Sequence, residues 1–428
     1  MAQIEWDAKR IAEFEMRKFV PHEAKSDPNA AGSAYDWRFS DCRWKIDPWV
    51  KFISGVVHHT IDVLTPTDSV TFDFSSALVV DSVKVQGETA QFGFADEFVL
   101  YVKHQALAST QSCVVSIYYQ GEPVNYNLGS FNQSFHAGET PEIWTLSEPF
   151  GAKDWWPCKQ TLSDKLDSIS ISINVPVGNK AGAPGSLEAV VDEGDETETY
   201  RWMHRYPIPA YLVSLAVTNY LEFTQIVDVG GTEVEVVNYV FPERLELEQE
   251  RAEAVPGMMV LFSELFDLYP YADEKYGHCL ATIGGGMEHP TMSTMSGLYF
   301  SLTAHELAHQ WFGNKVTCGS WEDIWLNEGF ATYMTGLAYE HLQSENFHEW
   351  KMGVVQSITS QPDGSVMVDD TLDVTRIFNS RLSYNKGAYL LRMLQWILGD
   401  EDFFQACRDY LNHPDLAFSY ARTPQLID

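Results

Sequence analysis

The chain has 428 residues, of which 45% are apolar and 13% aromatic, and its 60 acidic and 28 basic residues give a formal charge of −32. This length and composition predict a globular protein of two or three domains with substantial cores. A field this negative repels nucleic acid and anionic membranes, so neither is expected as a partner. The charge either keeps the protein in solution or favours cationic ligands.

The six cysteines are scattered and form no CxxC pair, so no disulfide framework is expected and no cysteine cluster competes for a metal. No apolar run reaches the roughly 20 residues of a membrane-spanning helix. The first residues, Met1–Trp6, lack the apolar core of a signal peptide. We therefore expect a soluble protein, either cytoplasmic or exported with a signal peptide removed. The oligomeric state is left open.

Residues 1–34 are expected to form a polar lead-in, and residues 35–224 a β domain. Strict alternation over Asp167–Val175 is the period-2 pattern of a half-buried strand. The acidic run Asp192–Glu196 is expected to form a solvated hairpin loop. Similar short apolar runs cover 98–102, 113–119 and 187–191. The pattern predicts an amino-terminal domain of antiparallel sheets, arranged as a β-sandwich or saddle.

Residues 225–428 are expected to form a mostly helical domain, which makes the whole chain an α+β multidomain protein. A short strand over 233–241 precedes a helix whose apolar residues at helical spacing are Met258, Met259, Phe262, Leu265 and Phe266. A Gly-rich turn at 283–290 leads to a helix that ends near 312–314. Further helices are expected after Leu326 and over about 386–398.

The segment His305-Glu306-Leu307-Ala308-His309 carries the main chemical signal. Residues four apart lie on one face of a helix, so the two imidazoles can bind one ion. Zinc lowers the pKa of bound water to about 7, and Glu306 beside it can take the proton. The alternative for Glu306 is a solvent-facing helix carboxylate.

A third ligand is expected, because a catalytic zinc takes three protein ligands and leaves one position to water. Glu328 is the best candidate, since it lies nineteen residues after His309 at the start of the next helix. The alternative is that Glu328 merely favours a helix amino terminus. Asp323, Glu322 or a backbone carbonyl could accept the histidines' outer N–H groups.

Residues 305–314, together with Trp325-Leu326-Asn327-Glu328-Gly329 and the next three residues, closely resemble the aminopeptidase N-like zinc aminopeptidases, gluzincins that include leukotriene hydrolase relatives. The resemblance implies that His305, His309 and Glu328 bind one Zn²⁺. It also implies that Glu306 activates water. The fold implied is an amino-terminal β domain followed by a thermolysin-like catalytic domain.

Gly285-Gly286-Met287-Glu288-His289 resembles the exopeptidase signature of that family, which usually reads Gly-Ala-Met-Glu-Asn or Gly-Gly-Met-Glu-Asn. By resemblance Glu288 binds the free α-amino group, as a buried carboxylate can through charge-assisted hydrogen bonds. Gly285, Gly286 and Met287 would let substrate backbone lie along the strand edge. The departure at His289 affects the expected pocket shape. The alternative is a Gly-rich turn with a surface glutamate.

Two further residues match family segments. Glu148-Pro149, nine residues before the pair Pro157-Cys158, fits the second amine-binding glutamate, against the alternative of an exposed loop residue. Tyr384 begins Tyr-Asn-Lys-Gly-Ala, which resembles the family's Tyr-x-Lys-Gly-Ala. A phenol aimed at the developing oxyanion would stabilise it. The alternative is a tyrosine capping a core helix.

The resemblance runs from about residue 35 to the end, and the family's carboxy-terminal helical domain is expected to be absent. The predicted function is hydrolysis of the first peptide bond of peptides with a free amino terminus. Three alternatives stay open. They are a zinc endopeptidase, an epoxide hydrolase as in one branch of the family, and a peptide-binding protein with a dead site.

Overall fold

The computed structural model describes residues 32–110, 112–124 and 130–427. The predicted lead-in over 1–34 lies almost wholly outside these residues. Two compact units meet in sequence between Tyr220 and Leu221, and each is described by itself. The predicted domain boundary between 224 and 225 falls inside strand β16 (Leu221–Val229) and stays a prediction.

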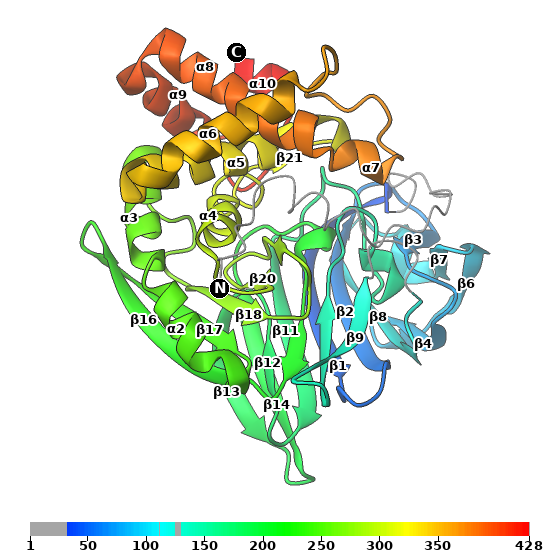
Figure 1. The fold of residues 1–428 in the computed structure, drawn as a ribbon. Coiled ribbons are helices and arrows are strands. Elements are labelled where there is room, and N and C mark those ends of the chain that lie inside the picture. Colours follow the sequence, from blue (N-terminus) through cyan, green and yellow to red (C-terminus); the bar gives the residue numbers. More distant parts are fainter. Residues whose placement is uncertain (1–31, 111, 125–129, 428) are drawn as a thin grey trace. The chain divides into compact units, whose positions relative to one another are not determined.

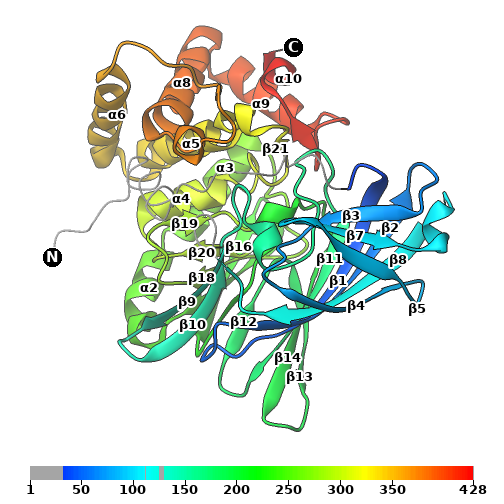
Figure 2. The same cartoon turned by 90° about the vertical axis from the view of Figure 1, so that its right-hand side faces the viewer.

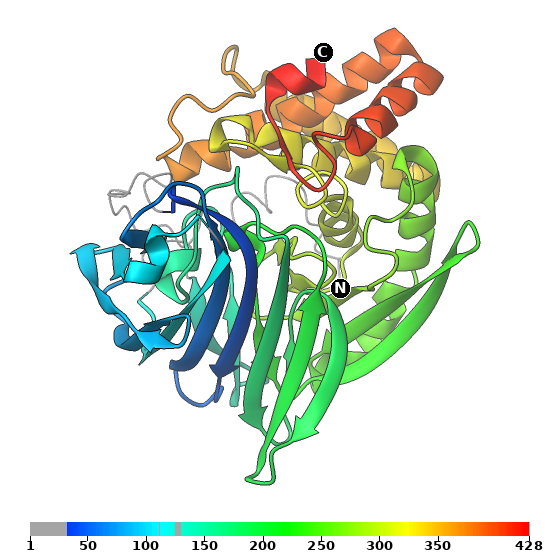
Figure 3. The same ribbon diagram turned by 180° about the vertical axis from the view of Figure 1, so that it is seen from behind.

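The first unit contains an eight-stranded open sheet. Its strand order is β13 (Ser186–Asp192), β14 (Thr197–His204), β11 (Ser168–Pro176), β1 (Tyr35–Lys45), β2 (Ile53–Val63), β8 (Ser112–Gly121), β4 (Val79–Val85) and β5 (Glu88–Thr89). Figure 3 shows its central strands side by side, in blue to green. The sheet differs from the antiparallel expectation in one pair, because β1 and β11 run parallel, with Phe39 opposite Ser168.

Alternation along β11 explains how this sheet packs. Ile169, Ile171 and Ile173 are fully buried, whereas the intervening serines lie on the partly exposed face. The core beneath contains stacked indoles, with the ring centroids of Trp37 and Trp156 5.6 Å apart. The predicted hairpin is confirmed, since β13 ends at Asp192 and β14 starts at Thr197.

Two smaller sheets complete this unit (Figure 2). A four-stranded sheet has the order β12 (Lys180–Gly182), β15 (Ala216–Thr218), β10 (Thr140–Thr145) and β9 (Phe131–His136). A three-stranded sheet has the order β3 (Ser69–Asp73), β7 (Val99–Lys103) and β6 (Gln91–Asp96). Single 3₁₀ turns lie at η1 (Gln105–Ala108), η2 (Ala152–Asp154) and η3 (Ala210–Leu212). Glu148 lies in the loop between β10 and η2.

The second unit combines a five-stranded sheet with a helical layer and a separate two-stranded sheet. The sheet order is β16, β17 (Thr232–Val240), β18 (Tyr276–Leu280), β20 (Ser293–Met295) and β19 (Gly286–Met287), so β19 is an edge strand. Between β17 and β18 the chain forms the 3₁₀ turn η4 (Pro242–Arg244) and the helices α2 (Leu245–Ala252) and α3 (Val255–Phe266). Burial of Met258, Met259, Phe262 and Phe266 confirms four of the five core residues predicted for α3, whereas Leu265 is only half-buried.

The remaining elements of this unit follow the sheet in sequence. They are α4 (Phe300–Ala308), β21 (Thr317–Cys318), η5 (Trp321–Asp323), α5 (Trp325–Leu342), α6 (Ser344–Thr359), α7 (Val374–Ile377), the π-helical segment η6 (Ser380–Lys386), α8 (Gly387–Leu398), α9 (Asp400–Asn412), β22 (Tyr420–Ala421) and α10 (Thr423–Ile427). Helix α4 packs between β19 and α5, and α5 also contacts α6 and α8 (Figure 1). In the part of the chain described, no helix combines the length and apolarity needed to cross a bilayer.

Candidate metal centre and substrate site

Three side chains from two helices converge on one point. His305 lies in α4 and His309 immediately after it, while Glu328 lies in the first turn of α5. The two histidine Nε2 atoms are 3.1 Å apart. Glu328 Oε2 lies 3.2 Å from the His305 Nε2 and 3.4 Å from the His309 Nε2. All three residues are buried.

This triangle has the dimensions of a tetrahedral metal site. Zinc bonds of about 2.0–2.1 Å at tetrahedral angles put neighbouring ligand atoms about 3.3 Å apart, close to the three separations observed. Two imidazole nitrogens that face each other at 3.1 Å cannot both donate a hydrogen, and they approach as two ligands of one ion do. The residues therefore fit a zinc ion.

The outer nitrogen of His309 is fixed by the backbone. Its Nδ1 lies 3.0 Å from the carbonyl oxygen of Phe312, so an N–H at Nδ1 leaves Nε2 to face the other ligands. The predicted helix end near 312–314 is in fact a tight turn after Ala308, in which Gly313 has a φ of +134°. Asp323, an acceptor considered from the sequence, instead accepts hydrogen bonds from Thr423.

Two further buried carboxylates, Glu288 and Glu306, lie beside the triangle that contains Glu328, and the pKa values of the three carboxylates differ. Burial raises the pKa of Glu288 to about 7, with His309 opposing the shift and Glu328 adding to it. Burial likewise raises the pKa of Glu306 well above its ordinary value. Burial also acts to raise the pKa of Glu328, but the neighbouring histidines outweigh it and lower that pKa. Glu328 is therefore the carboxylate that stays ionised, whereas Glu288 and Glu306 hold their protons more tightly than exposed glutamates do.

The Glu306 carboxylate lies against the glycine-rich strand. A Cβ built on Gly286 would lie 2.2 Å from the Oε1 of Glu306, so only glycine leaves room for that carboxylate position. Glu306, Glu288 and His309 also bring ligand atoms within 4.8 Å of one another. Gly285 and Met287 are buried beside them, and Met287 pairs with Thr294 of β20.

Tyr384 stands over the first histidine. Its ring is stacked on that of His305, with centroids 6.0 Å apart and an interplanar angle of 15°. The tyrosine is fully buried within the π-helical segment η6, a feature that often marks functional sites. The segment is anchored at its start, where the Asn379 side chain accepts from the Leu382 N–H.

His289, which departs from the family signature, is a neutral buried residue. Its Nδ1 lies 2.9 Å from Thr294 Oγ1, and its Nε2 has no hydrogen-bond partner among the described residues. Burial lowers the pKa of His289 to about 3. The ring therefore adds no positive charge next to Glu288.

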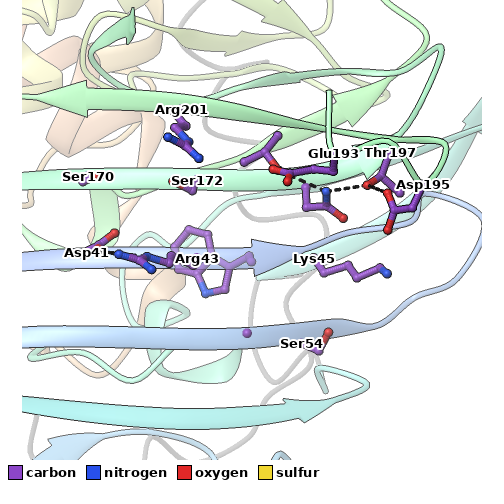
Figure 4. A pocket seen from close by; sticks show the side chains of 14 residues that line it. Asp41, Arg43, Lys45, Ser54, Ser170, Ser172, Glu193, Asp195, Thr197 and Arg201 are labelled. Carbon is purple, nitrogen blue, oxygen red and sulfur yellow. Dashed lines mark hydrogen bonds and ion pairs between the residues drawn. The ribbon is translucent and has the colours of Figure 1, made fainter. Parts of the chain in front are cut away.

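Glu148 belongs to the first unit. It is buried in the loop after β10, and its bond to Pro149 is cis. A separate hollow of about 690 Å³ lies on the sheet of that unit (Figure 4). Its charged residues are partly paired, as Arg43 is with Asp41, and none of the predicted site residues lines it. We read this hollow as the solvated face of the sheet.

Two family models match the chain in sequence order. The peptidase M1 N-terminal domain matches residues 33–212, and the peptidase family M1 domain matches residues 285–427. The chain belongs to peptidase family M1. Its fold, a β-rich amino-terminal part followed by a helical catalytic part, is the one expected for that family.

Named relatives of this M1 chain are aminopeptidases. Rat glutamyl aminopeptidase is 28% identical over 78% of this chain and 38% of its own length. Leucyl aminopeptidase from Saccharolobus solfataricus is 27% identical over 85% of this chain and 47% of its own length. The chain thus spans less than half of either relative.

Solved M1 structures share the fold. An M1 zinc metallopeptidase variant from Deinococcus radiodurans, bound to a Tyr-Ser-Ala substrate, superimposes with a TM-score of 0.80 at 23% identity, over 93% of this chain and 90% of that one. Leukotriene A4 hydrolase from Saccharomyces cerevisiae gives a TM-score of 0.76 at 22% identity, over 97% of this chain and 68% of that one.

Sequence reasoning missed the groups that support this site. Gln310 and Asn314 lie inside the quoted motif, yet no role was predicted for them. Their partners are backbone atoms of the turn after β19, which side-chain patterns do not reveal. From the sequence, the backbone carbonyl that orients His309 is only one of several possible acceptors.

Proposed function

We propose that this M1 chain is a zinc-dependent aminopeptidase that hydrolyses the first peptide bond of peptides with a free amino terminus. The observation that carries the proposal is the buried triangle of His305, His309 and Glu328, with Glu288 and Glu306 beside it. The aminopeptidase names of its relatives support the substrate class.

His305, His309 and Glu328 would hold one zinc ion. When bound, zinc acts as a Lewis acid, which polarises a substrate carbonyl and lowers the pKa of water. Glu306 accepts a proton from the attacking water and later passes it to the leaving amine. Burial raises the pKa of Glu306, which makes it a stronger proton acceptor than an exposed glutamate. The nearby buried carboxylate Glu288 accepts charge-assisted hydrogen bonds from the substrate ammonium group.

Tyr384 is proposed to donate a hydrogen bond to the carbonyl oxygen as negative charge develops there. Its full burial supports this role, because a donor shielded from water stabilises an oxyanion more strongly than an exposed one. Glu148 stays a prediction as a second amine-binding carboxylate. Gly285, Gly286 and Met287 are proposed to lie along the substrate backbone, since β19 is an edge strand.

The test compares reporters with free and acetylated amino termini. We expect hydrolysis of free aminoacyl amides only, and loss of activity with a chelator. Glu306→Gln should keep its zinc and lose activity by at least about a hundredfold, because it removes the proton acceptor and keeps the size of the side chain. Full activity of Glu306→Gln would rule out the mechanism. Equal turnover of acetylated and free reporters would instead indicate a zinc endopeptidase.

A further inference from the structure

The turn that follows Glu288 has a strained backbone. Thr291 has a φ of +63°, a region that β-branched residues adopt only where surrounding contacts hold them. Its N–H donates to Gln310 Oε1 at 2.9 Å. On the other side, Lys275 Nζ donates to the Thr291 carbonyl oxygen at 2.8 Å and to its Oγ1 at 3.2 Å. The turn is therefore clamped from two sides.

A second set of bonds reaches Glu288 itself. The carbonyl oxygen of Glu288 accepts from Asn314 Nδ2 at 2.7 Å and from Gln310 Nε2 at 3.3 Å. Gln310 directly follows His309, and the Asn314 N–H donates to the His309 carbonyl oxygen at 2.9 Å. The Gln310 amide thus uses both of its ends to tie the Glu288 turn to the segment that carries a metal ligand.

This arrangement fixes the distance between the carboxylate that binds the amine and the residues that bind the metal. The α-amine of a peptide lies two bonds from its first carbonyl carbon, so an amine ligand must stay at a fixed distance from the metal ligands. A shift of a fraction of an ångström at Glu288 would weaken amine binding and leave the metal site as it is.

We infer that Gln310 and Asn314 are positioning residues for amine recognition, which hold Glu288 in register with His305 and His309, and that Lys275 supports the turn from behind. The inference rests on the proposed function. All three side chains are buried, and neither Gln310 nor Asn314 needs to touch substrate for this role. A purely structural role would instead affect the binding of every ligand equally.

The test measures inhibition constants of two small competitors without a scissile amide, L-leucinol and 4-methylpentan-1-ol, which differ only in the amine. Gln310→Leu keeps volume and removes every side-chain hydrogen bond of Gln310, including the one to the Glu306 carbonyl oxygen at 3.4 Å. In this variant the constant for leucinol should rise about tenfold, as expected for a weakened charge-assisted bond. The constant for 4-methylpentan-1-ol should change less than about twofold, and bound zinc should stay at the wild-type amount. The matched control is Thr335→Val, which removes a buried bond to the Ala331 carbonyl oxygen within α5 and leaves the Glu288 turn untouched. It should change neither constant.

Asn314→Ala decides the question by the same criterion if Gln310→Leu does not fold. An equal rise of both constants, or no rise in either, in a folded variant would overturn the inference. Failure of the proposed function looks different, because the wild-type protein would then hydrolyse no free aminoacyl reporter.

Discussion

Gly329 and Gly387 meet backbone to backbone: a Cβ built on either residue would lie 3.0 Å from the Cα of the other. Gly329 follows Glu328 in α5, and Gly387 opens α8 three residues after Tyr384. The contact therefore fixes how closely the proposed oxyanion donor approaches the proposed metal ligand. Any side chain at this contact has to push the two helices apart.

Gly387→Ala should lower kcat by about ten- to a hundredfold, because a methyl group forced into this contact moves Tyr384 relative to Glu328. Steady-state kinetics and bound zinc would be measured together. The control is Gly353→Ala on α6, where a Cβ meets nothing within 4 Å. It should leave kcat unchanged and stabilise the protein slightly. Wild-type kcat in Gly387→Ala would show that the contact does not set the geometry.

Tyr384→Phe should lower kcat by about a hundred- to a thousandfold with little change in KM, as for the loss of one oxyanion donor. The phenyl ring keeps the stacking on His305, so zinc content should not change. Tyr389→Phe, on the neighbouring helix α8, serves as the control and should behave as wild type. A variant that keeps more than a tenth of wild-type kcat would exclude the oxyanion role.

Removal of metal should destabilise the second unit. His305, His309 and Glu328 come together only in the folded chain, so a divalent cation bound by them stabilises the folded state. Calorimetry with and without chelator should show a lower melting temperature without metal. A ligand present at a thousand times its Kd raises the free energy of unfolding by about 4 kcal/mol. In Glu328→Ala the chelator should lower the melting temperature much less. An equal shift in that variant would place the responsible ion elsewhere.

The stability of the first unit should depend on Asp73. Burial raises the pKa of Asp73 to about 7, although its carboxylate accepts a hydrogen bond from the Gln160 N–H. Because the folded pKa exceeds the unfolded value near 4, the folded state holds its proton longer. Protonation of Asp73 therefore contributes to the free energy of unfolding. This contribution is complete below pH 4 and is lost as pH rises through 7, and the loss is up to about 4 kcal/mol. Denaturant melts between pH 4 and 8 should show a flatter profile in Asp73→Asn. An identical pH profile in the variant would exclude Asp73 as the source of the pH dependence.

The sequence predicted the parts of the fold and site that depend on local spacing. The alternation of β11 and the four-residue step between His305 and His309 are of this kind, because side-chain periodicity fixes which face each residue takes. The parallel pairing of β1 with β11 could not be predicted, since it joins segments more than a hundred residues apart. The bond from Thr291 to Gln310 was missed because it depends on a backbone conformation that no residue pattern signals.

The π-helical segment at Ser380–Lys386 has a consequence for how this chain could be altered. A π-helical turn holds about one residue more than an α-helical turn, so the direction in which Tyr384 faces depends on the number of residues before α8 as much as on their identity. Deleting one residue between Asn379 and Leu382 would turn the phenol by about 100° around the helix axis. The most damaging change at this position is therefore a change in chain length, which a scan of single substitutions never samples.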